Sequence, residues 1–267
     1  MKDEMMAKIM DEVISLREVS KIYRREEGEV HALDHVSLAV RRGEFLAVVG
    51  SSGSGKTTLM NLMGCLDAPT QGVCRFEGED VSQLSEQRLA EIRNQRIGFV
   101  FQGFNLIGGL TAQENVELPL AYRGVPSSVR RTLAREALAL VGLGDRTEHL
   151  PGQLSGGQQQ RVAVARAIAA KPPILLADEP TGNLDPESGR AVMEILRELN
   201  REGRTLVLIT HDMALAAMAQ RRVRIRRGKL WGEEEQHEFA DSGEGIFGGF
   251  RPSDLVDNPL ADDIIRR

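Results

Sequence analysis

The sequence is poor in several features that would assign it to particular classes of protein. Its two cysteines, Cys65 and Cys74, lack the paired Cys/His spacing of a zinc site, so we expect small buried thiols in a reducing compartment. No apolar run approaches the ~18–20 residues that a membrane span needs. The N-terminal segment MKDEMMAKIMDE is charged throughout and lacks the apolar region of a signal peptide. These absences predict a cytosolic chain that reaches a membrane only through a partner.

The sequence also lacks an excess of basic residues. The net charge is −5, and from residue 229 onward ten acidic residues face four basic ones, which leaves +1 on residues 1–228. This balance does not favour a protein that binds duplex nucleic acid. A length of 267 residues with 41% hydrophobic residues suits one large α/β domain.

Short apolar runs predict the strands of a mainly parallel sheet. Residues 13–49 contain strand-like segments separated by the turn signals Glu27-Gly28 and Arg42-Gly43. Four nearly continuous apolar runs have the pattern of strands buried on both faces, and they cover residues 45–49, 97–101, 174–177 and 206–209. Each run ends abruptly in small or polar residues. Because ligands bind beyond the carboxyl ends of parallel strands, these four ends predict one shared site.

Helical patterns fill much of the remaining chain. Residues 85–149 contain several such segments, and the periodicity puts Leu133, Ala137, Leu140 and Val141 on one face. We interpret this region as a mostly helical insertion in the sheet domain. The segment after Trp231 is acidic, glycine-rich and without periodicity, which is typical of a disordered tail. The segment also contains more apolar residues than a solvated tail usually has, so a docking segment is the alternative.

The segment GSSGSGKT, from Gly50 to Thr57, fits the phosphate-binding pattern G-x-x-x-x-G-K-[ST]. It follows a buried strand and opens a helix-like run, which is the context that the pattern requires. Glycines allow backbone N–H groups to surround phosphate oxygens, and the start of a helix adds partial positive charge. We expect Lys56 to contact the β- and γ-phosphates and the Thr57 hydroxyl to bind Mg²⁺.

An Asp-Glu pair follows the third apolar run, in the segment ILLADEP. We expect Asp178 to reach Mg²⁺ through its water shell and Glu179 to polarise an attacking water as a general base. Such a pair also occurs at ordinary solvated strand ends. Together with a phosphate loop, it favours nucleotide hydrolysis.

Two glycines in the segment QLSGGQQQR lie at the start of an alanine-rich helix. Ser155 and Gln158 fit the capping box S-x-x-Q, which accounts for a helix start. The box does not account for Gly156 and Gly157, which together cost the first turn up to roughly 2 kcal/mol against alanine. Missing side chains at a helix start are useful where an anion approaches bare N–H groups.

With LSGGQ at residues 154–158 added to these motifs, the chain resembles the ATP-binding cassette (ABC) ATPase family over about residues 12–231. The motifs stand in the family's order: Walker A at 50–57, the glutamine loop at Gln102, the signature at 154–158, Walker B at 174–179, GNLD at 182–185 and the switch histidine at His211. The resemblance implies an α/β fold with a P-loop NTPase (RecA-like) core, an N-terminal antiparallel β subdomain and an inserted helical subdomain at about residues 103–165. Residues 232–267 form an acidic tail beyond the family's usual end.

The resemblance also implies roles for particular residues. Tyr23 would stack on adenine, with an ordinary strand tyrosine as the alternative, and Gln102 would contact Mg²⁺ or the attacking water. His211 would contact the γ-phosphate and hold Glu179. Asp185 would communicate between sites, and it also fits an N-cap followed by proline. The remaining residues expected at ATP are Gly50, Ser51, Ser52, Gly53, Ser54, Gly55, Lys56, Thr57 and Thr58 of one chain, and Ser155, Gly156, Gly157 and Gln158 of a second chain packed head to tail.

The implied function is that of the ATP-hydrolysing subunit of an ABC transporter complex, in which ATP binding, closure of a homodimer and hydrolysis move separate membrane permease subunits. ATP and Mg²⁺ are the implied cofactors, and the inner face of a bacterial cell membrane is the implied location. MNLMGCLDAPTQG and ADEPTGNLD resemble the branch of lipoprotein release, macrolide export and mechanotransmission, although Gly108-Gly109 departs from that branch's usual proline-containing loop. The alternative is a soluble ABC ATPase acting on nucleic acid or ribosomes, which usually carries coiled coils, zinc modules or a second cassette.

Overall fold

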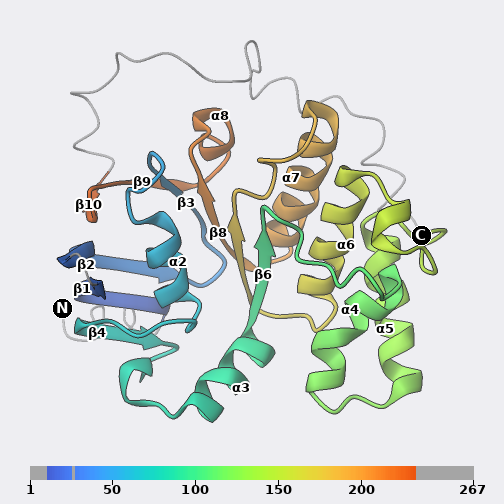
Figure 1. Cartoon of the computed structure of the whole chain (residues 1–267), viewed down its shortest axis with the longest axis horizontal. Helices are drawn as coiled ribbons and strands as arrows, with labels where there is room; N and C mark the ends of the chain where they lie inside the picture. Colours follow the sequence, from blue (N-terminus) through green and yellow to red (C-terminus); the bar gives the residue numbers. More distant parts are fainter. Residues whose placement is uncertain (1–10, 26–27, 233–267) are drawn as a thin grey trace.

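Two β-sheets with helices around them make up the described part of the chain. The computed structural model describes residues 11–25 and 28–232 (Figure 1). The smaller sheet has the strand order β2-β1-β4-β5, and the larger sheet has the order β10-β9-β3-β8-β7-β6. Apart from Gly232, the acidic tail expected at residues 232–267 lies outside the described residues.

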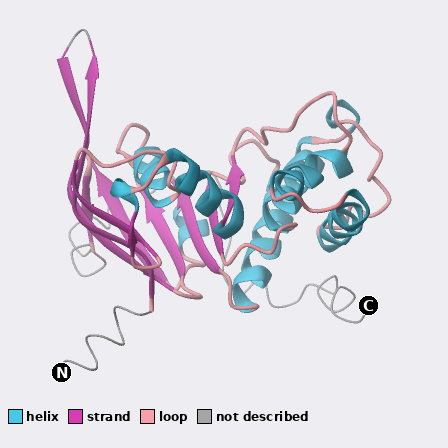
Figure 2. Cartoon of the chain, turned by 90° about the horizontal axis from the view of Figure 1, so that it is seen from below, coloured by secondary structure: helices cyan, strands magenta, loops and turns pink. Residues whose placement is uncertain are grey.

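The smaller sheet is antiparallel and is built on a long hairpin. Its strands are β1 (Glu12–Arg25), β2 (Gly28–Arg41), β4 (Gln71–Phe76) and the short β5 (Glu79–Asp80). Along the second half of β2, Val36, Leu38 and Val40 are buried and alternate with less buried residues. This period of two is typical of a sheet with one face on the core. Figure 2 shows the β1–β2 hairpin extending away from the rest of the chain.

The larger sheet contains the four buried strands expected from the apolar runs. They are β3 (Phe45–Val49), β6 (Ile97–Phe101), β7 (Ile174–Asp178) and β8 (Thr205–Thr210), and they run parallel. A fifth parallel strand, β9 (Arg221–Arg226), pairs with β3, and β10 (Lys229–Trp231) pairs antiparallel with β9 at the edge. The carboxyl ends of the four buried strands therefore lie at one edge of the sheet, as predicted.

Helices lie beside the larger sheet and in a second group to one side of it. The first set comprises α2 (Lys56–Met63), α3 (Glu86–Arg96), α7 (Pro186–Arg201) and α8 (Met213–Ala216), with the single-turn 3-10 helix η1 (Val81–Gln83) before α3. The second group comprises α4 (Ala112–Tyr122), α5 (Ser127–Leu140) and α6 (Gly156–Ile168), with η2 (Pro151–Gln153) before α6 (Figure 1). Every helix within the described ranges is too short or too polar for a membrane span.

Two hydrophobic clusters cover the two faces of the larger sheet. Leu46 and Val48 of β3 belong to the cluster that includes α2 and the antiparallel sheet. Phe45 of β3 and Leu206 and Leu208 of β8 belong to the cluster shared with α4 to α7. Successive strand residues point to opposite faces, so a nearly continuous apolar run is what a sheet covered on both faces requires.

The buried face of α5 differs from the one expected. Ala137 and Val141 are buried as predicted, but Leu140 is 51% exposed, so the prediction is wrong for this residue. The buried stripe runs through Ala134, Ala137 and Leu138. At about 100° per residue, Leu140 lies on the flank of a stripe centred there.

Both cysteines are buried free thiols, as expected from the sequence. Burial raises the pKa of Cys65 to about 11 and that of Cys74 to about 12. Because the thiolate is the reactive form, these two side chains act as small apolar groups at neutral pH.

Candidate functional site

The polar ends of four neighbouring strands meet at one edge of the larger sheet. Because β3, β8, β7 and β6 are consecutive in the sheet, the residues that follow them lie side by side. The register aligns Val49 with Thr210 and Phe101 with Asp178. The motif residues directly after these strands are Gly50, Gln102, Glu179 and His211.

The phosphate loop, residues 50–57, turns from β3 into α2 through a glycine. Gly55 has a φ of 108°, in the left-handed region, and a Cβ there would lie 2.5 Å from the backbone oxygen of Ala32. Glycine is therefore required at this position. The Lys56 ammonium is nearly buried and donates to the backbone oxygens of Gly50 at 2.7 Å and Ser51 at 3.0 Å. Its positive charge thus lies inside the loop.

The first turn of α2 is open to an anion. Within the described residues, no side chain caps its N–H groups and no acidic residue lies in the turn. Ser51, Ser52 and Gly53 are exposed, and the buried Ser54 hydroxyl has no hydrogen-bond partner in the same part of the chain. Uncapped N–H groups at a helix start bind anions, and Lys56 adds a full charge.

Asp178 lies between the phosphate loop and Glu179. Burial raises the pKa of Asp178, as does the charge of Glu179, whereas Lys56 and a hydrogen bond with Thr57 lower it without reversing the shift. A carboxylate beside a hydroxyl offers two oxygen ligands to Mg²⁺. No cluster of three His, Cys, Asp or Glu side chains suited to a metal occurs within the described ranges. The two oxygen donors of Asp178 and Thr57 fit Mg²⁺, which usually takes its other ligands from water and phosphates.

Glu179 is oriented by the end of β8. Its φ of 46° lies in the left-handed region, which is unusual for glutamate, and its N–H donates to the Ile209 oxygen at 2.8 Å. Its Oε1 is 2.8 Å from Nδ1 of His211, and its Oε2 accepts a 3.4 Å hydrogen bond from the Thr210 hydroxyl. Glu179 therefore contacts the residues at the end of β8, whereas Asp178 lies beside Lys56 and Thr57. Unusual backbone of this kind is concentrated at functional sites.

Gln102 forms a reciprocal pair with an asparagine in the loop before α7. Its Nε2 donates to Oδ1 of Asn183 at 3.2 Å, and Nδ2 of Asn183 donates to the Gln102 backbone oxygen at 3.1 Å. A Cβ at Gly182 would lie 2.7 Å from the Gln102 amide nitrogen, so glycine keeps room for the pair. The expected contact of Gln102 with Mg²⁺ or water stays a prediction.

Tyr23 lies on β1, close to the start of α2. Its hydroxyl donates to Asp67 at 2.9 Å, and the Lys21 ammonium lies 5.1 Å from the ring centre. Burial and then the bond to Asp67 raise the pKa of Tyr23, whereas a hydrogen bond with Thr58 lowers it. The ring is thus anchored beside the helix that follows the phosphate loop, and its role at adenine stays a prediction.

The two signature glycines have different surroundings. The capping box is present: Ser155 accepts from the Gln158 N–H at 3.3 Å, and Gln158 accepts from the Ser155 N–H at 2.9 Å. A Cβ at Gly157 would overlap the Ser188 side chain, 2.6 Å from its Cβ. A Cβ at Gly156 would find its nearest atom 3.8 Å away, an ordinary contact. Packing within the chain therefore explains Gly157 and leaves Gly156 unexplained.

Asp185 begins α7 and sets the position of Ser188. Its carboxylate accepts from the N–H groups of Glu187 at 3.1 Å and Ser188 at 2.9 Å, and Pro186 follows as the first helical residue, so the predicted N-cap is confirmed. Hydrogen bonds from the backbone and side chain of Ser188 lower the pKa of Asp185. Because Ser188 fills the space above Gly157, this cap connects the loop before α7 to the start of α6.

Gln160 is a positioning residue that sequence reasoning missed. It is fully buried on α6, and its Nε2 donates to the backbone oxygens of Phe101 at 3.2 Å and Pro180 at 2.7 Å. One amide thus ties the signature helix to residues adjoining Gln102 and Glu179. Its position in QQQR gave no signal, because glutamines are mostly exposed and three stand in a row.

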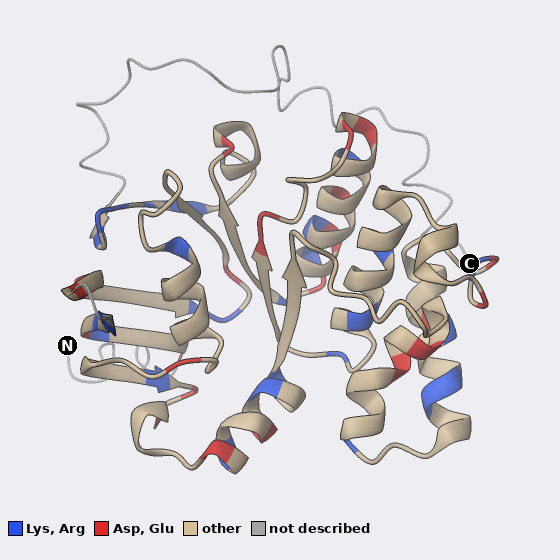
Figure 3. Ribbon diagram, viewed as in Figure 1, with Lys and Arg blue, Asp and Glu red and all other residues tan. Residues whose placement is uncertain are grey.

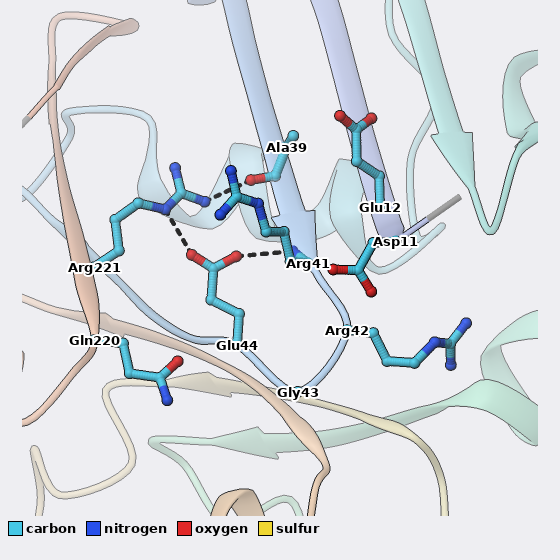
Figure 4. A pocket seen from close by; sticks show the side chains of 9 residues that line it. All are labelled: Asp11, Glu12, Ala39, Arg41, Arg42, Gly43, Glu44, Gln220 and Arg221. Carbon is cyan, nitrogen blue, oxygen red and sulfur yellow. Dashed lines mark hydrogen bonds and ion pairs between the residues drawn. The ribbon is translucent and has the colours of Figure 1, made fainter. Parts of the chain in front are cut away.

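A separate pocket of about 540 Å³ lies at the opposite edge of the larger sheet, where β3 and β9 begin (Figure 4). Glu44 lies in it, and its carboxylate is paired with Arg221 at 2.6 Å and with the Arg41 N–H at 2.8 Å. The Arg221 guanidinium also donates to the Ala39 oxygen. These charges are satisfied within the chain, and the pocket is distinct from the phosphate loop.

The structure therefore divides the predicted site residues into two sets. The phosphate loop, Gln102, Asp178, Glu179 and His211 lie at the carboxyl edge of the sheet, and Tyr23 lies beside α2. The signature, residues 155–158, belongs to the other set. The nearest neighbours of its glycines are Ser188, Phe104, Asn183 and Leu184, and none of these is in the phosphate loop.

The known proteins that this chain resembles are described as ABC transporter proteins. A family model described as ABC transporter matches residues 33–182, more than half of the chain. An uncharacterised ABC transporter ATP-binding protein of Thermotoga maritima is 52% identical over 85% of this chain and 97% of its own length. The uncharacterised ABC transporter ATP-binding protein YvrO of Bacillus subtilis is 50% identical over 82% of this chain and 95% of its own. The macrolide export ATP-binding/permease protein MacB of Hyphomonas neptunium is 52% identical over 82% of this chain, which spans only 34% of MacB.

Solved structures agree with these relatives. A dimeric post-hydrolysis structure of the ATP-binding cassette MJ0796 with ADP and Pi is 41% identical, has a TM-score of 0.77 and covers 88% of this chain and 100% of its own. A second dimeric structure of MJ0796, described as a bacterial ABC transporter cassette, has the same TM-score and 43% identity. These neighbours confirm the predicted α/β fold and give no support to a role on nucleic acid. By its family match, its relatives and its fold, the chain belongs to the ABC transporter family as an ATP-hydrolysing subunit.

Proposed function

We propose that this ATPase cleaves ATP at the carboxyl edge of the larger sheet, with Glu179 as the general base. The observation that carries the proposal is the 2.8 Å contact between Glu179 Oε1 and His211 Nδ1, one residue beyond Asp178. With its proton on Nδ1, His211 donates to Glu179 and fixes the plane of the carboxylate. Glu179 can then accept the proton of a water that attacks the γ-phosphate.

The two carboxylates take different parts in this proposal because their partners differ. Asp178 lies next to Lys56 and Thr57, so it would bind Mg²⁺ with the Thr57 hydroxyl, and Gln102 would approach the same ion or the water. Bound Mg²⁺ would offset the negative charge of the β- and γ-phosphates. Lys56 would exchange its two carbonyl partners for phosphate oxygens, because hydrogen bonds between charged groups are stronger.

We also propose that Tyr23 binds the adenine ring. One face of its ring carries the Lys21 ammonium, and its hydroxyl is fixed on Asp67. A tyrosine held in this way loses little conformational freedom when a base stacks on the opposite face. The hydrogen bond with Thr58 links the ring to the helix that would hold the phosphates.

Hydrolysis, we propose, requires two chains packed head to tail. The start of α6 neighbours α7 and its loop, and a side chain at Gly156 would make only ordinary contacts within its own chain. That bare helix start suits the γ-phosphate of ATP bound to the phosphate loop of a second chain, with Ser155, Gly156, Gly157 and Gln158 as its contacts and Asp185 nearby. The relative MJ0796 is described as dimeric with ADP and Pi bound.

The work of the dimer, in this proposal, is to move separate membrane permease subunits for export, lipoprotein release or mechanotransmission. MacB relatives are named as combined ATP-binding/permease proteins, and this chain corresponds to about a third of one. We assign the cassette to residues 12–231, with a helical subdomain at about 103–165 and a position on the inner face of the bacterial cell membrane. Ile107 is 50% exposed beside Gly108-Gly109, which suits a contact with the permease.

Replacing Glu179 with glutamine tests the proposed base. The Glu179→Gln variant should bind ATP and trap a dimer, but its turnover should fall by about two to three orders of magnitude, since a general base contributes ~10²–10⁴-fold. Turnover is measured by phosphate release and the dimer by size-exclusion chromatography with ATP. Glu202→Gln, at an exposed residue after α7, serves as the control. Near-normal turnover in Glu179→Gln would remove Glu179 from this role.

Loss of the phosphate-loop charge gives a second readout of the same site. Lys56→Ala should lose nucleotide binding, because the Lys56 ammonium supplies the full positive charge inside the phosphate loop. Unchanged affinity for ATP in this variant would refute the assignment of the loop.

A further inference from the structure

The C-terminal hairpin of the larger sheet carries a dense group of positive charges. We call β9, β10 and the turn between them, residues 221–231, the basic hairpin. Six of the nine residues from 221 to 229 are Arg or Lys and none is acidic. In Figure 3 the Lys and Arg positions along β9 and β10 are coloured blue. Successive side chains of β9 point to opposite faces, so Val223 and Ile225 are buried in the core. The opposite face of the strand carries Arg222, Arg224 and Arg226.

Two arginines of the basic hairpin lack a counter-charge within the described residues. Arg221 is paired with Glu44 at 2.6 Å, and Lys229 is paired with Asp34 at 3.2 Å. The side chains of Arg224 and Arg227 make no hydrogen bond or ion pair to any residue that the structure describes. Clustered like charges favour an anionic partner, because each added negative charge relieves several repulsions.

The same hairpin supports both ends of the phosphate loop. The Gly228 N–H donates to the Ser54 oxygen at 2.9 Å. A Cβ at Gly50 would lie 2.5 Å from the Ile225 oxygen, and a Cβ at Gly55 would lie 3.2 Å from the Ile225 side chain. Because such close packing transmits small shifts, a change in the hairpin reaches the residues that hold phosphate. The positive face is also near, since Arg224 is aligned with Val49, immediately before the loop.

The chain itself supplies an anionic partner. Residues 233–263 contain ten acidic residues and one arginine, a net charge of −9. Only Gly232 separates this acidic segment from Trp231 at the end of β10. A tether that short gives a high effective concentration, so weak ion pairs are sufficient for binding.

We propose that the acidic segment 233–263 binds the basic hairpin of its own chain and lowers the affinity of the phosphate loop for ATP. The affinity for ATP should fall because the bound segment brings negative charge to the basic hairpin, which packs against the loop that must bind the phosphates of ATP. The effect is local, since interactions between exposed charges fall off over a Debye length of ~8 Å at physiological salt. The second half of the proposal rests on the proposed nucleotide site, whereas the docking does not.

A binding experiment tests the docking directly. A chain that ends at Gly232 is titrated into a labelled peptide of residues 233–263, and binding is followed by fluorescence anisotropy. This shorter chain is expected to fold, because the solved cassette MJ0796 is covered over its whole length by 88% of this chain. The peptide should bind at low salt and be released at ~1 M salt, where the Debye length falls to ~3 Å.

Charge variants locate the contact. Arg224→Gln/Arg227→Gln should weaken peptide binding at least about tenfold, since each lost surface ion pair changes an affinity a few-fold. Arg131→Gln/Lys171→Gln removes the same charge from exposed positions on α5 and before β7 and should leave binding unchanged. No binding, or equal weakening by both pairs, would overturn the docking. Capture of the Gly232-ending chain by phosphatidylglycerol vesicles, without binding of the peptide, would overturn it in favour of a lipid surface.

The coupling has a readout of its own. The chain that ends at Gly232 should bind MgATP about threefold more tightly than the full chain at low salt, and equally at ~1 M salt. Equal affinities at low salt would overturn the coupling to the loop. Peptide binding requires no hydrolysis, so failure of the docking and failure of the Glu179 proposal are distinguishable.

Discussion

Replacing Gly156 with aspartate separates what the signature does within its own chain from what it does for a second chain. In its own chain the change is mild, because a Cβ would find its nearest atom, in the Phe104 ring, at 3.8 Å. An acidic side chain in the first turn also stabilises a helix by about 0.3–1 kcal/mol. The melting temperature of the Gly156→Asp chain should therefore equal or exceed that of the original chain.

In the head-to-tail dimer the same carboxylate would face the γ-phosphate of the partner's ATP. Two unit negative charges about 5 Å apart repel by roughly 3 kcal/mol at an effective dielectric constant of about 20. That penalty corresponds to a loss of about two orders of magnitude in the hydrolysis rate. ATP binding by the single chain should be nearly unchanged, because Lys56 and the start of α2 belong to the other set of site residues.

The assay compares three variants by phosphate release at several protein concentrations, thermal melting and ATP titration. Gly156→Asn is the matched control, since it has the same shape without the charge and should retain much more activity than Gly156→Asp. Gly157→Ala should lower the melting temperature because its Cβ would overlap Ser188 of the same chain. Normal hydrolysis by a folded Gly156→Asp chain would refute the contact between chains and leave the signature as a capping box alone.

Two further variants test contacts within the chain. Gln160→Leu should lower the free energy of unfolding by about 1–3 kcal/mol in urea titrations, because the backbone oxygens of Phe101 and Pro180 lose their donor; an unchanged midpoint would contradict this reasoning. Burial alone would raise the pKa of Asp67, but hydrogen bonds from Lys21, Tyr23 and the Ala68 N–H lower this pKa overall. The ionised Asp67 therefore stabilises the folded chain at pH values above the unfolded pKa of about 3.9, and this stabilisation is lost as the pH falls through the folded pKa. Asp67→Asn should therefore destabilise by about 1 kcal/mol at neutral pH and not at all in strong acid, as thermal melts against pH would show; a loss independent of pH would exclude the ionic contribution.

Local patterns in the sequence predicted the framework of the fold well. The buried strands, the glycine-rich turn into α2, and the caps at Ser155 and Asp185 each depend on residues close together in the chain. The face of α5 was less predictable, because Leu140 continues the apolar period although the packing stripe runs through Ala134 and Leu138. Periodicity gives the width of a stripe and not the neighbour that covers it.

Contacts between distant segments could not be predicted from the sequence. The need for glycine at 157 comes from Ser188, on a different helix. The hydrogen bond from Gly228 to Ser54 joins residues that are 174 positions apart in the chain. No local spacing encodes such contacts, because they depend on how the elements are arranged in the folded chain. The sequence indicated a site at the strand ends, and the structure adds the groups that hold that site in place.

In the proposed dimer each ATP site is made by the phosphate loop of one chain and the signature of another, and this sharing can be tested by mixing two defective chains. Lys56→Ala chains and Gly156→Asp chains should each hydrolyse ATP very slowly. In a mixed dimer, one site combines the intact loop of the second variant with the intact signature of the first. If the site is shared, the mixture should release phosphate at a rate well above the sum of the two separate rates. A rate equal to that sum would contradict a site shared between two chains.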